Sequence, residues 1–333
     1  MTTEPQIKGL ILAAGFGTRL MPFTEVTPKP LFPFFGPKIL DLALFRLQRS
    51  GINHAAVNTH HLASKIEDHL TSIKWFTNIN ISNEKVILGT GGSINPIRSW
   101  IGDSHLVIYN SDIVSTIDIS KLVETHFANK SIATMCLLPS CKPGKTPIYT
   151  REKSVISIEK EPENYTNKHS FTGVHIISPE FINMIPKSGE SSIITTYINA
   201  IKNQKRVSFH VHKDYWHDLG IPKDFYEAQI ELLKNPNSLL DTLGINSINT
   251  KNRYEIDFIL DKTYPNIEPP VSLPKSLKIP SSSHIGPNFI MTNIDHIPEK
   301  VRLKNGSFFF QSQIADGEEF SDGMKGFARL VKW

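Results

Sequence analysis

Short apolar runs alternate with segments of helical periodicity through the first third of the chain, and this alternation constrains the fold more than any other feature. Strand candidates cover residues 7–13, 55–58, 79–82 and 105–109, and helix candidates between them cover 39–49, 63–70 and 92–100. Strands that alternate with helices form parallel β–α–β units. The sequence therefore predicts a Rossmann-like α/β fold, with a mixed, mostly parallel sheet and flanking helices.

From about residue 132 the chain becomes richer in strands. Strand candidates cover residues 132–138, 154–159, 172–177 and 207–212, and helix candidates cover 179–184, 191–202 and 222–234. Prolines and serines crowd the end of the stretch 236–281, so we expect that stretch to be a linker or an extended wrap.

Beyond this stretch, apolar residues recur every six positions. The hexad positions are Ile285, Met291, Ile297, Leu303 and Phe309, and after one slip Ile314 and Phe320. A six-residue period is typical of the hexapeptide β-helix, in which each side of a triangular coil contributes one inward residue. We therefore expect residues 282–333 to form a small left-handed β-helix-like domain.

Composition and charge exclude several classes of protein. Hydrophobic residues make up 39% and charged residues 20% of the 333 residues, as in a globular chain, and the net charge is only +4. No basic stripe indicates a nucleic-acid partner, and no apolar run is long enough to span a membrane. The two cysteines, Cys136 and Cys141, lack a second pair for a zinc site. We expect a cytoplasmic protein with two reduced thiols.

A glycine-rich turn follows the first strand and carries two cations. A dinucleotide fingerprint would need a third glycine at position 20, which is Leu20, and the Gly-Lys-Ser/Thr of a Walker loop is absent. Small residues at Gly15 and Gly17 let backbone N–H groups approach a polyphosphate. Arg19 adds a cationic fork, and prolines on both sides stiffen the backbone of Lys29. Taken alone, the turn fits either a phosphate site or a plain surface loop.

The complete segment is more specific. Residues 15–31, GFGTRLMPFTEVTPKPL, resemble the signature of the sugar-1-phosphate nucleotidylyltransferase family, and five further motifs of that family follow in its order. These are Leu88-Gly89-Thr90-Gly91-Gly92, Asn110-Ser111-Asp112, Ile158-Glu159-Lys160-Glu161-Pro162, Phe171-Thr172-Gly173-Val174 and Trp216-His217-Asp218-Leu219-Gly220-Ile221-Pro222. Two positions depart from the usual pattern: Ser111 replaces a smaller residue, and Ile221 replaces a threonine.

The resemblance implies a catalytic domain over residues 1–235 and a Mg²⁺-dependent reaction between a nucleoside triphosphate and a sugar 1-phosphate. It implies that Arg19, Lys29 and Asp112 are catalytic and that Asp112 and Asp218 hold the metal. It implies nucleotide contacts from Leu12, Ala13, Gly15, Gly17, Thr18, Glu84, Gly89 and Gly91. It implies contacts with the sugar phosphate from Asn110, Glu159, Lys160 and Gly173.

Several alternatives stay open at this level. The chain looks most like bacterial mannose-1-phosphate guanylyltransferases, which use GTP, but it also resembles uridylyltransferases that use UTP and N-acetylmuramate 1-phosphate. A catalytically silent relative that senses nucleotide sugars is a further hypothesis. We also expect that residues 282–333 could join copies of the chain into a homo-oligomer.

Overall fold

The computed structural model describes residues 6–252, 256–259, 265–292, 294–309 and 312–333. These residues form two compact units, each of which we describe by itself. Unit 1 comprises Met1–Gly15 and Ala43–Trp216, and unit 2 comprises Phe16–Leu42 and His217–Trp333. The chain therefore enters unit 2 twice, and the intervening 43–216 belongs to unit 1.

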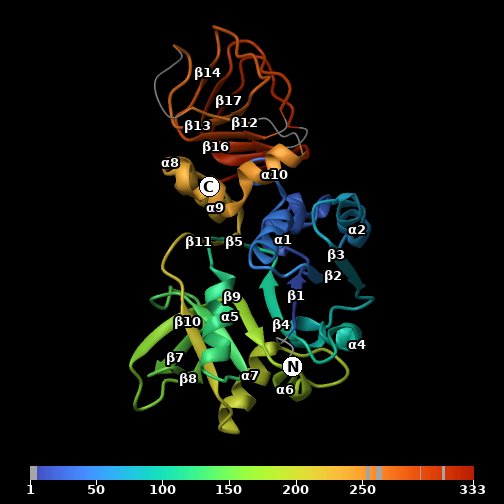
Figure 1. Ribbon diagram of the computed structural model, residues 1–333. Helices are drawn as coiled ribbons and strands as arrows, with labels where there is room; N and C mark the ends of the chain where they lie inside the picture. Colours follow the sequence, from blue (N-terminus) through green and yellow to red (C-terminus); the bar gives the residue numbers. More distant parts are fainter. Residues whose placement is uncertain (1–5, 253–255, 260–264, 293, 310–311) are drawn as a thin grey trace. The chain divides into compact units, whose positions relative to one another are not determined.

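A nine-stranded sheet forms the centre of unit 1 (Figure 1). In spatial order its strands are β3 (Asn78–Asn83), β2 (His54–Thr59), β1 (Ile7–Leu12), β4 (His105–Asn110), β9 (Asn167–Ile177), β6 (Ala133–Leu137), β10 (Val207–Val211), β8 (Ser154–Ile158) and β7 (Pro147–Arg151). From the pairings, β8 and β9 run against the other strands of this sheet. The predicted mixed sheet is confirmed; its parallel pairings are those among β3, β2, β1 and β4 and that of β6 with β10, while the pairings of β8 and β9 are antiparallel.

Helices cover the sheet of unit 1 where their apolar faces meet it. The helices that pack on its strands are α2 (Ala63–Ser72), α5 (Ile119–Ala128) and α7 (Ile193–Lys202), while α6 (Pro179–Met184) packs on α7. The helix α1 (Ile39–Arg49) lies so close to β1 that a Cβ at Gly9 would be 2.7 Å from a methyl carbon of Leu47. Among the described residues, no helix is both long and apolar enough to cross a bilayer.

Two parts of unit 1 differ from the expected elements. The single helix expected over residues 92–100 is three short pieces, α3 (Gly89–Gly92), η4 (Asn95–Ile97) and α4 (Arg98–Ile101), because Pro96 cannot continue a helix that began before it. The sequence analysis missed α5, which opens on an Asp118 cap that accepts a hydrogen bond from Lys121 N–H at 3.1 Å. It also missed β7 and the short β5 (Ile113–Ser115).

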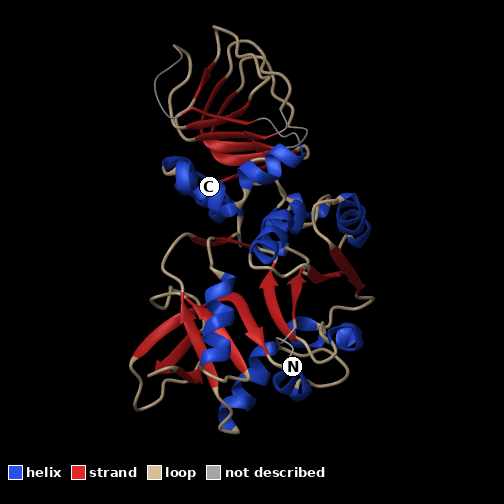
Figure 2. Ribbon diagram, in the orientation of Figure 1, coloured by secondary structure: helices blue, strands red, loops and turns tan. Residues whose placement is uncertain are grey.

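Unit 2 contains the signature segment, a group of helices and a second sheet. Its elements are η1 (Thr18–Leu20), η2 (Phe23–Glu25), η3 (Lys29–Leu31), α8 (Pro222–Lys234), α9 (Pro236–Leu243), α10 (Ile245–Asn252), β12 (Ile256–Ile259), β13 (Val271–Pro274), β14 (His284–Ile285), β15 (Phe289–Thr292), β16 (Arg302–Phe309), β17 (Glu319–Gly326) and β18 (Arg329–Lys332), preceded by β11 (Trp216–Asp218). Figure 2 shows the helices of this unit beside its strands. The linker expected over 236–281 therefore begins with two helices and contains two strands, although its residues 253–255 and 260–264 lie outside the described ones.

The second sheet has the pairing that a coiled chain produces. Parallel pairing joins Val271 to Phe289, which is three hexads further along the chain. It then joins Phe289 to Gly306, which is one position short of three more hexads. Strands that pair in parallel are thus about three hexads apart in the chain, a spacing compatible with a hexapeptide coil. Antiparallel strands β12 and β18 close the two ends of the sheet. A left-handed β-helix-like domain over residues 282–333 stays a prediction.

The hexad pattern predicted the buried residues well, except at its slip. Ile285, Met291, Ile297 and Leu303 are almost fully buried in one apolar cluster. Phe309 was expected to point into this cluster, but Phe308 occupies that place and pairs with Met291, one position short of three hexads before it. The step from Leu303 to the next buried residue is five positions and not six, so Phe308 and not Phe309 points into the cluster.

Phe309 instead packs on the signature segment. Its ring centroid lies 5.4 Å from that of Phe23, 5.7 Å from that of Phe32 and 5.4 Å from that of Phe327. Phe225 of α8 joins the same aromatic cluster. These rings tie residues 16–42 to the C-terminal strands within unit 2.

Buried histidines in unit 1 should make its stability depend on pH. Burial lowers the pKa of His126 to about 3, helped by the neighbouring His105, and burial lowers the pKa of His175 to about 3. The folded state then binds fewer protons than the unfolded state below a pH of about 6.5. We expect stability to be constant above that value and to fall towards pH 3, by up to ~1.4 kcal/mol per pH unit for each histidine.

Urea denaturation between about pH 8 and pH 5 measures this slope. His175→Gln should lower stability at high pH, since the hydrogen bond between His175 Nδ1 and Tyr197 OH at 2.8 Å is disturbed, but it should also flatten the slope. His54→Gln, at an exposed position, is the matched control. An unchanged slope in the His175 variant would contradict the assignment.

Candidate active site

The predicted site residues fall on both units. In unit 1, the end of β1 is joined to the end of β2 by Asn58. Ala13 N–H donates to Asn58 Oδ1 at 2.6 Å, and Asn58 Nδ2 donates to Glu84 Oε1 at 2.8 Å. The other oxygen of Glu84 accepts from Leu88 N–H at 3.0 Å. Glu84, expected to contact the nucleotide, is only 3% exposed and braces the glycine loop, and Asn58 is a member of this site that the sequence analysis missed.

The glycine loop 88–92 lies against residues 189–193. Gly91 N–H donates to Ser191 O at 2.8 Å, and Ile193 N–H donates to Thr90 Oγ1 at 3.0 Å. A Cβ at Gly89 would be 2.7 Å from Ser191 O. The glycines are therefore required by packing within the protein. Any contact of Ala13 or Gly91 with a base has to use groups other than these two N–H donors.

Gly89→Ala should destabilise unit 1 more than a left-handed backbone alone explains. Gly89 has φ +72, and its Cβ would also meet the Ser191 carbonyl. A left-handed conformation costs roughly 1–2 kcal/mol for a residue with a Cβ, and overpacking adds roughly 1–3 kcal/mol. The measurement is the free energy of unfolding in denaturant.

Gly144→Ala is the matched control for this substitution. Gly144 has φ +73, and a Cβ there meets no described atom within 4 Å. It should show only the conformational part of the cost. An equal loss of unfolding free energy in the two variants would mean that the segment 189–193 moves aside at no cost.

Three polar residues stand at the end of β4, and the middle one, Ser111, ties β4 to β1. Ser111 N–H and Ser111 Oγ both donate to Leu12 O, at 3.1 and 2.6 Å. The unusual serine thus has a structural role, and it occupies the carbonyl of Leu12. Its neighbours Asn110 and Asp112 are only partly buried. Asp112 stands at the carboxyl end of a central strand, where ligands collect in open α/β sheets.

Gly173 on β9 faces the side chain of Asn110. A Cβ on Gly173, which has φ +85, would be 2.8 Å from Asn110 Nδ2 and 2.4 Å from Ile113 Cδ1. Next to it, Thr172 O accepts a bond from Trp216 Nε1 at 3.0 Å. The structure therefore brings together Asn110 and Gly173, two of the residues expected to bind the sugar phosphate, with Trp216 bonded to the residue before Gly173.

The other two sugar-side residues follow β8. Glu159 and Lys160 are exposed, and Glu159 has φ +70. The next residue, Glu161, is held by Tyr165 OH at 2.9 Å and by Tyr149 OH at 3.4 Å. Tyrosine bonds thus fix Glu161, while the carboxylate and ammonium of its two predecessors face solvent.

In unit 2, the signature segment folds into three 3₁₀ turns around Gly17. Gly17 has φ +64, and its added Cβ would be 2.9 Å from Thr24 Cγ2 and 3.4 Å from Lys29 Cβ. Thr24 Oγ1 donates to Gly17 O at 3.0 Å. Lys29 is only 7% exposed, whereas Thr18 is exposed, as is Gly15 of unit 1. The Pro-Lys-Pro brace thus holds a largely buried lysine beneath the glycine turn.

Arg19 lies over the backbone that follows Asp218. A Cβ at Gly220 would be 3.0 Å from Arg19 Nη1, so the guanidinium lies close to this backbone. Asp218 is partly buried. Ile221, where a threonine cap was expected, donates its N–H to Asp224 Oδ2 at 3.3 Å, so the start of α8 keeps a side-chain partner. Unit 2 therefore brings Arg19 beside the segment 218–220.

Known proteins resemble this chain over about its first two thirds. Residues 8–235 match the family described as nucleotidyl transferase. A mannose-1-phosphate guanylyltransferase of Mycobacterium tuberculosis is 26% identical over 235 residues, which are 69% of this chain and 65% of that protein. A D-glycero-alpha-D-manno-heptose 1-phosphate guanylyltransferase of Aneurinibacillus thermoaerophilus is 27% identical over 227 residues, which are 68% of this chain and 98% of that protein. The chain thus matches less than two thirds of the length of the Mycobacterium relative.

Solved structures share the fold. A putative glucose-1-phosphate thymidylyltransferase from Bacillus anthracis, in complex with a sucrose, superimposes with a TM-score of 0.59 at 21% identity, covering 67% of this chain and 94% of that one. An apo UDP-glucose pyrophosphorylase gives 0.59 at 17% identity, covering 69% of this chain and 100% of that one. At these identities the likeness concerns the fold alone.

Proposed function

This chain belongs to the nucleotidyl transferase family, and from that premise we propose that it transfers a nucleotidyl group from a nucleoside triphosphate to a sugar 1-phosphate. A phosphate oxygen of the sugar 1-phosphate attacks the α-phosphorus, the bond from the α-phosphorus to the bridging oxygen breaks, and pyrophosphate leaves. The observation that carries the proposal lies in unit 2, where Arg19 rests against Gly220, two positions after Asp218. Within the fold of unit 2, the cation Arg19 thus lies close to the segment that carries the carboxylate of Asp218.

The charged residues have separate roles in this proposal. Arg19 stabilises charge on the leaving pyrophosphate, and Lys29 binds the α-phosphate or the sugar phosphate. No strong base is needed, because a phosphate monoester is already an anionic nucleophile. Positioning and electrostatic stabilisation then supply most of the rate. In the same proposal, Asn110, Glu159, Lys160 and Gly173 form the sugar side.

Asp112 and Asp218 are the residues that would hold Mg²⁺. Both supply carboxylate oxygens and are partly exposed, which fits an ion that takes one or two carboxylates and completes its shell with water and substrate phosphates. Within the described residues, no three His, Cys, Asp or Glu side chains cluster closely enough for an all-protein metal cage. Bound Mg²⁺ would screen the repulsion between the two anionic substrates.

For the substrates we propose GTP and mannose 1-phosphate. The guanylyltransferases among the relatives support this choice. The alternative is UTP with N-acetylmuramate 1-phosphate. Pyrophosphate release from a panel of triphosphates and sugar 1-phosphates, with Mg²⁺, tests both, and the pair with the highest kcat/KM decides between them.

A second outcome of the same panel would favour the silent sensor. In that case nucleotide sugars would raise the melting temperature by binding the folded state, but no pair would release pyrophosphate. Absence of turnover with every pair, in protein shown to be folded, would sink the proposed activity. A cytoplasmic location, and association of copies through residues 282–333, stay predictions; light scattering measures the second.

A further inference from the structure

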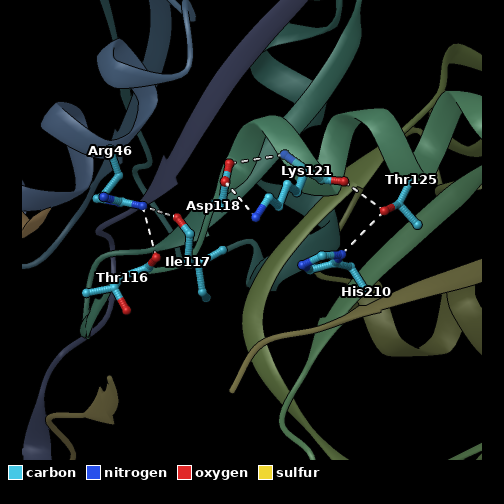
Figure 3. A network of polar contacts seen from close by, with 7 residues as sticks. All are labelled: Arg46, Thr116, Ile117, Asp118, Lys121, Thr125 and His210. Carbon is cyan, nitrogen blue, oxygen red and sulfur yellow. Dashed lines mark hydrogen bonds and ion pairs between the residues drawn. The ribbon is translucent and has the colours of Figure 1, made fainter. Parts of the chain in front are cut away.

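Arg46 of α1 carries a buried charge that the proposed reaction does not use. Its side chain is largely buried, and Nη2 donates to Thr116 O at 3.1 Å and also to Ile117 O (Figure 3). Burial lowers the pKa of Arg46, yet an arginine keeps its proton in a protein. A buried charge is costly unless it is well bonded, and an apolar side chain at this position would leave the carbonyls of Thr116 and Ile117 without this donor.

The carbonyls that Arg46 binds belong to a segment that is also held from its other side. Tyr109 OH and Ser115 Oγ are 2.9 Å apart, and Ile117 N–H reaches Ser115 Oγ at 3.5 Å. Asp112 lies between Tyr109 and Ser115 in the chain. The backbone turn that presents Asp112 therefore has fixed ends, and Arg46 fixes the downstream one.

Thr116 extends this connection to a second part of the chain. Its N–H and its Oγ1 donate to Tyr215 O, at 3.0 and 3.3 Å, while its own carbonyl accepts from Arg46. Tyr215 is buried, and the chain runs from it through Trp216 to Asp218. The backbone of Thr116 is thus hydrogen-bonded both to Arg46 and to Tyr215. Tyr215 immediately precedes β11, which carries Asp218, the second proposed metal ligand.

The same loop continues into α5. Asp118, next to Ile117, caps that helix, and Thr125 on it donates to Lys121 O at 2.7 Å and contacts His210 Nδ1 at 3.3 Å (Figure 3). The loop is therefore held by α1 on one side and by the start of α5 on the other. Helix α5 in turn contacts β10 through Thr125 and His210. Loss of the hydrogen bonds from Arg46 would remove the contacts that hold the loop to α1.

We propose that Arg46 is a positioning residue of the nucleotidyl transfer site: by fixing Thr116 and Ile117, it sets the backbone from which Asp112 and, through Tyr215, Asp218 reach the reacting phosphates. The inference rests on the proposed function. It requires that loss of Arg46 moves these backbone segments and lowers kcat, with little effect on substrate affinity.

Arg46→Met and Arg46→Lys test this role. Hydrogen exchange without substrates should accelerate in the peptides that cover 111–117 and 213–218. With substrates and Mg²⁺, Arg46→Met should lower kcat by roughly 10- to 100-fold, as small misplacements do, while KM changes less than about 3-fold. Arg46→Lys keeps the charge but changes the length and geometry of the group that reaches the two carbonyls, so its kcat should lie between those of Arg46→Met and wild type.

Arg98 offers a matched control. Its guanidinium also donates to two carbonyls, Ile182 O at 3.0 Å and Ile185 O at 2.9 Å, but it joins α4 to the end of α6. Arg98→Met should cost similar thermal stability and leave kcat unchanged. If Arg46→Met lowers the melting temperature as much but keeps wild-type kcat, Arg46 is structural only. If wild-type protein turns over no substrate, the proposed function fails, while the exchange experiment still decides whether Arg46 fixes the two segments.

Discussion

Asp112→Asn is expected to lower kcat/KM by roughly 10²–10³ while leaving the fold intact, a loss typical of removing one group that stabilises charge in the transition state, here through the proposed metal ion. The carboxylate stands after β4, at the strand end where an α/β sheet binds its ligand. Asparagine keeps the shape and removes the charge that a hard cation needs. Pyrophosphate release measures the rate, and denaturation should show a change in unfolding free energy of about 1 kcal/mol or less.

Asp103→Asn is the control for this variant. Asp103 is an exposed turn residue just before β4, so the same chemical change there should leave kcat/KM within about two-fold. A further test is the Mg²⁺ concentration that gives half-maximal rate, which should rise only in the Asp112 variant. Wild-type activity in a folded Asp112→Asn protein would remove Asp112 from the proposed site.

Phe309→Ala should have the largest effect on stability. Its side chain is 1% exposed and lies among Phe23, Phe32, Phe225 and Phe327 of unit 2. Truncating a buried phenylalanine costs about 3–5 kcal/mol. Because Phe23 and Phe32 flank Lys29 in the chain, we also expect kcat to fall at temperatures where the variant remains folded. Calorimetry and pyrophosphate release measure the two effects.

Two variants separate packing from general disturbance of the sheet. Phe309→Leu should lose about 1–2 kcal/mol, because it keeps part of the buried volume. Leu330→Ala changes a side chain of β18 that is 50% exposed, so it should stay within about 0.5 kcal/mol of wild type. Equal losses at positions 309 and 330 would show that the aromatic cluster contributes nothing specific. A protein that ends at Ser281 should lose activity for the same reason.

The sequence predicted the elements whose periodicity is strong. The parallel strands β1 to β4 and the helices α1, α2 and α8 lie where apolar spacing placed them. It failed where one residue outweighs a pattern, as at Pro96, which breaks the helix expected over 92–100. It also failed at the slip in the hexads, because a period cannot show in which coil a residue is missing, and Phe308 rather than Phe309 fills the core.

The residues of the proposed site were predicted from motifs, and the structure shows which contacts hold them. The family resemblance implied that Gly89 and Gly173 lie near a ligand, and the structure adds that Ser191 and Asn110 leave little room for a Cβ there. Asn58, Ser191 and Arg46 carried no signal in the sequence. Each acts on backbone groups far along the chain, and such partners become visible only once the fold brings them together.

The two-part composition of unit 2 also has a consequence during translation. The ribosome makes Phe32 early, yet its aromatic partners Phe225, Phe309 and Phe327 come near the end. At about 5–20 residues per second, the roughly 280 residues between Phe32 and Phe309 take on the order of 15–60 seconds to synthesise. The segment with Arg19 and Lys29 is thus among the first parts made and the last to acquire its neighbours, so in a nascent chain the proposed phosphate site would lack its aromatic support until synthesis is nearly complete.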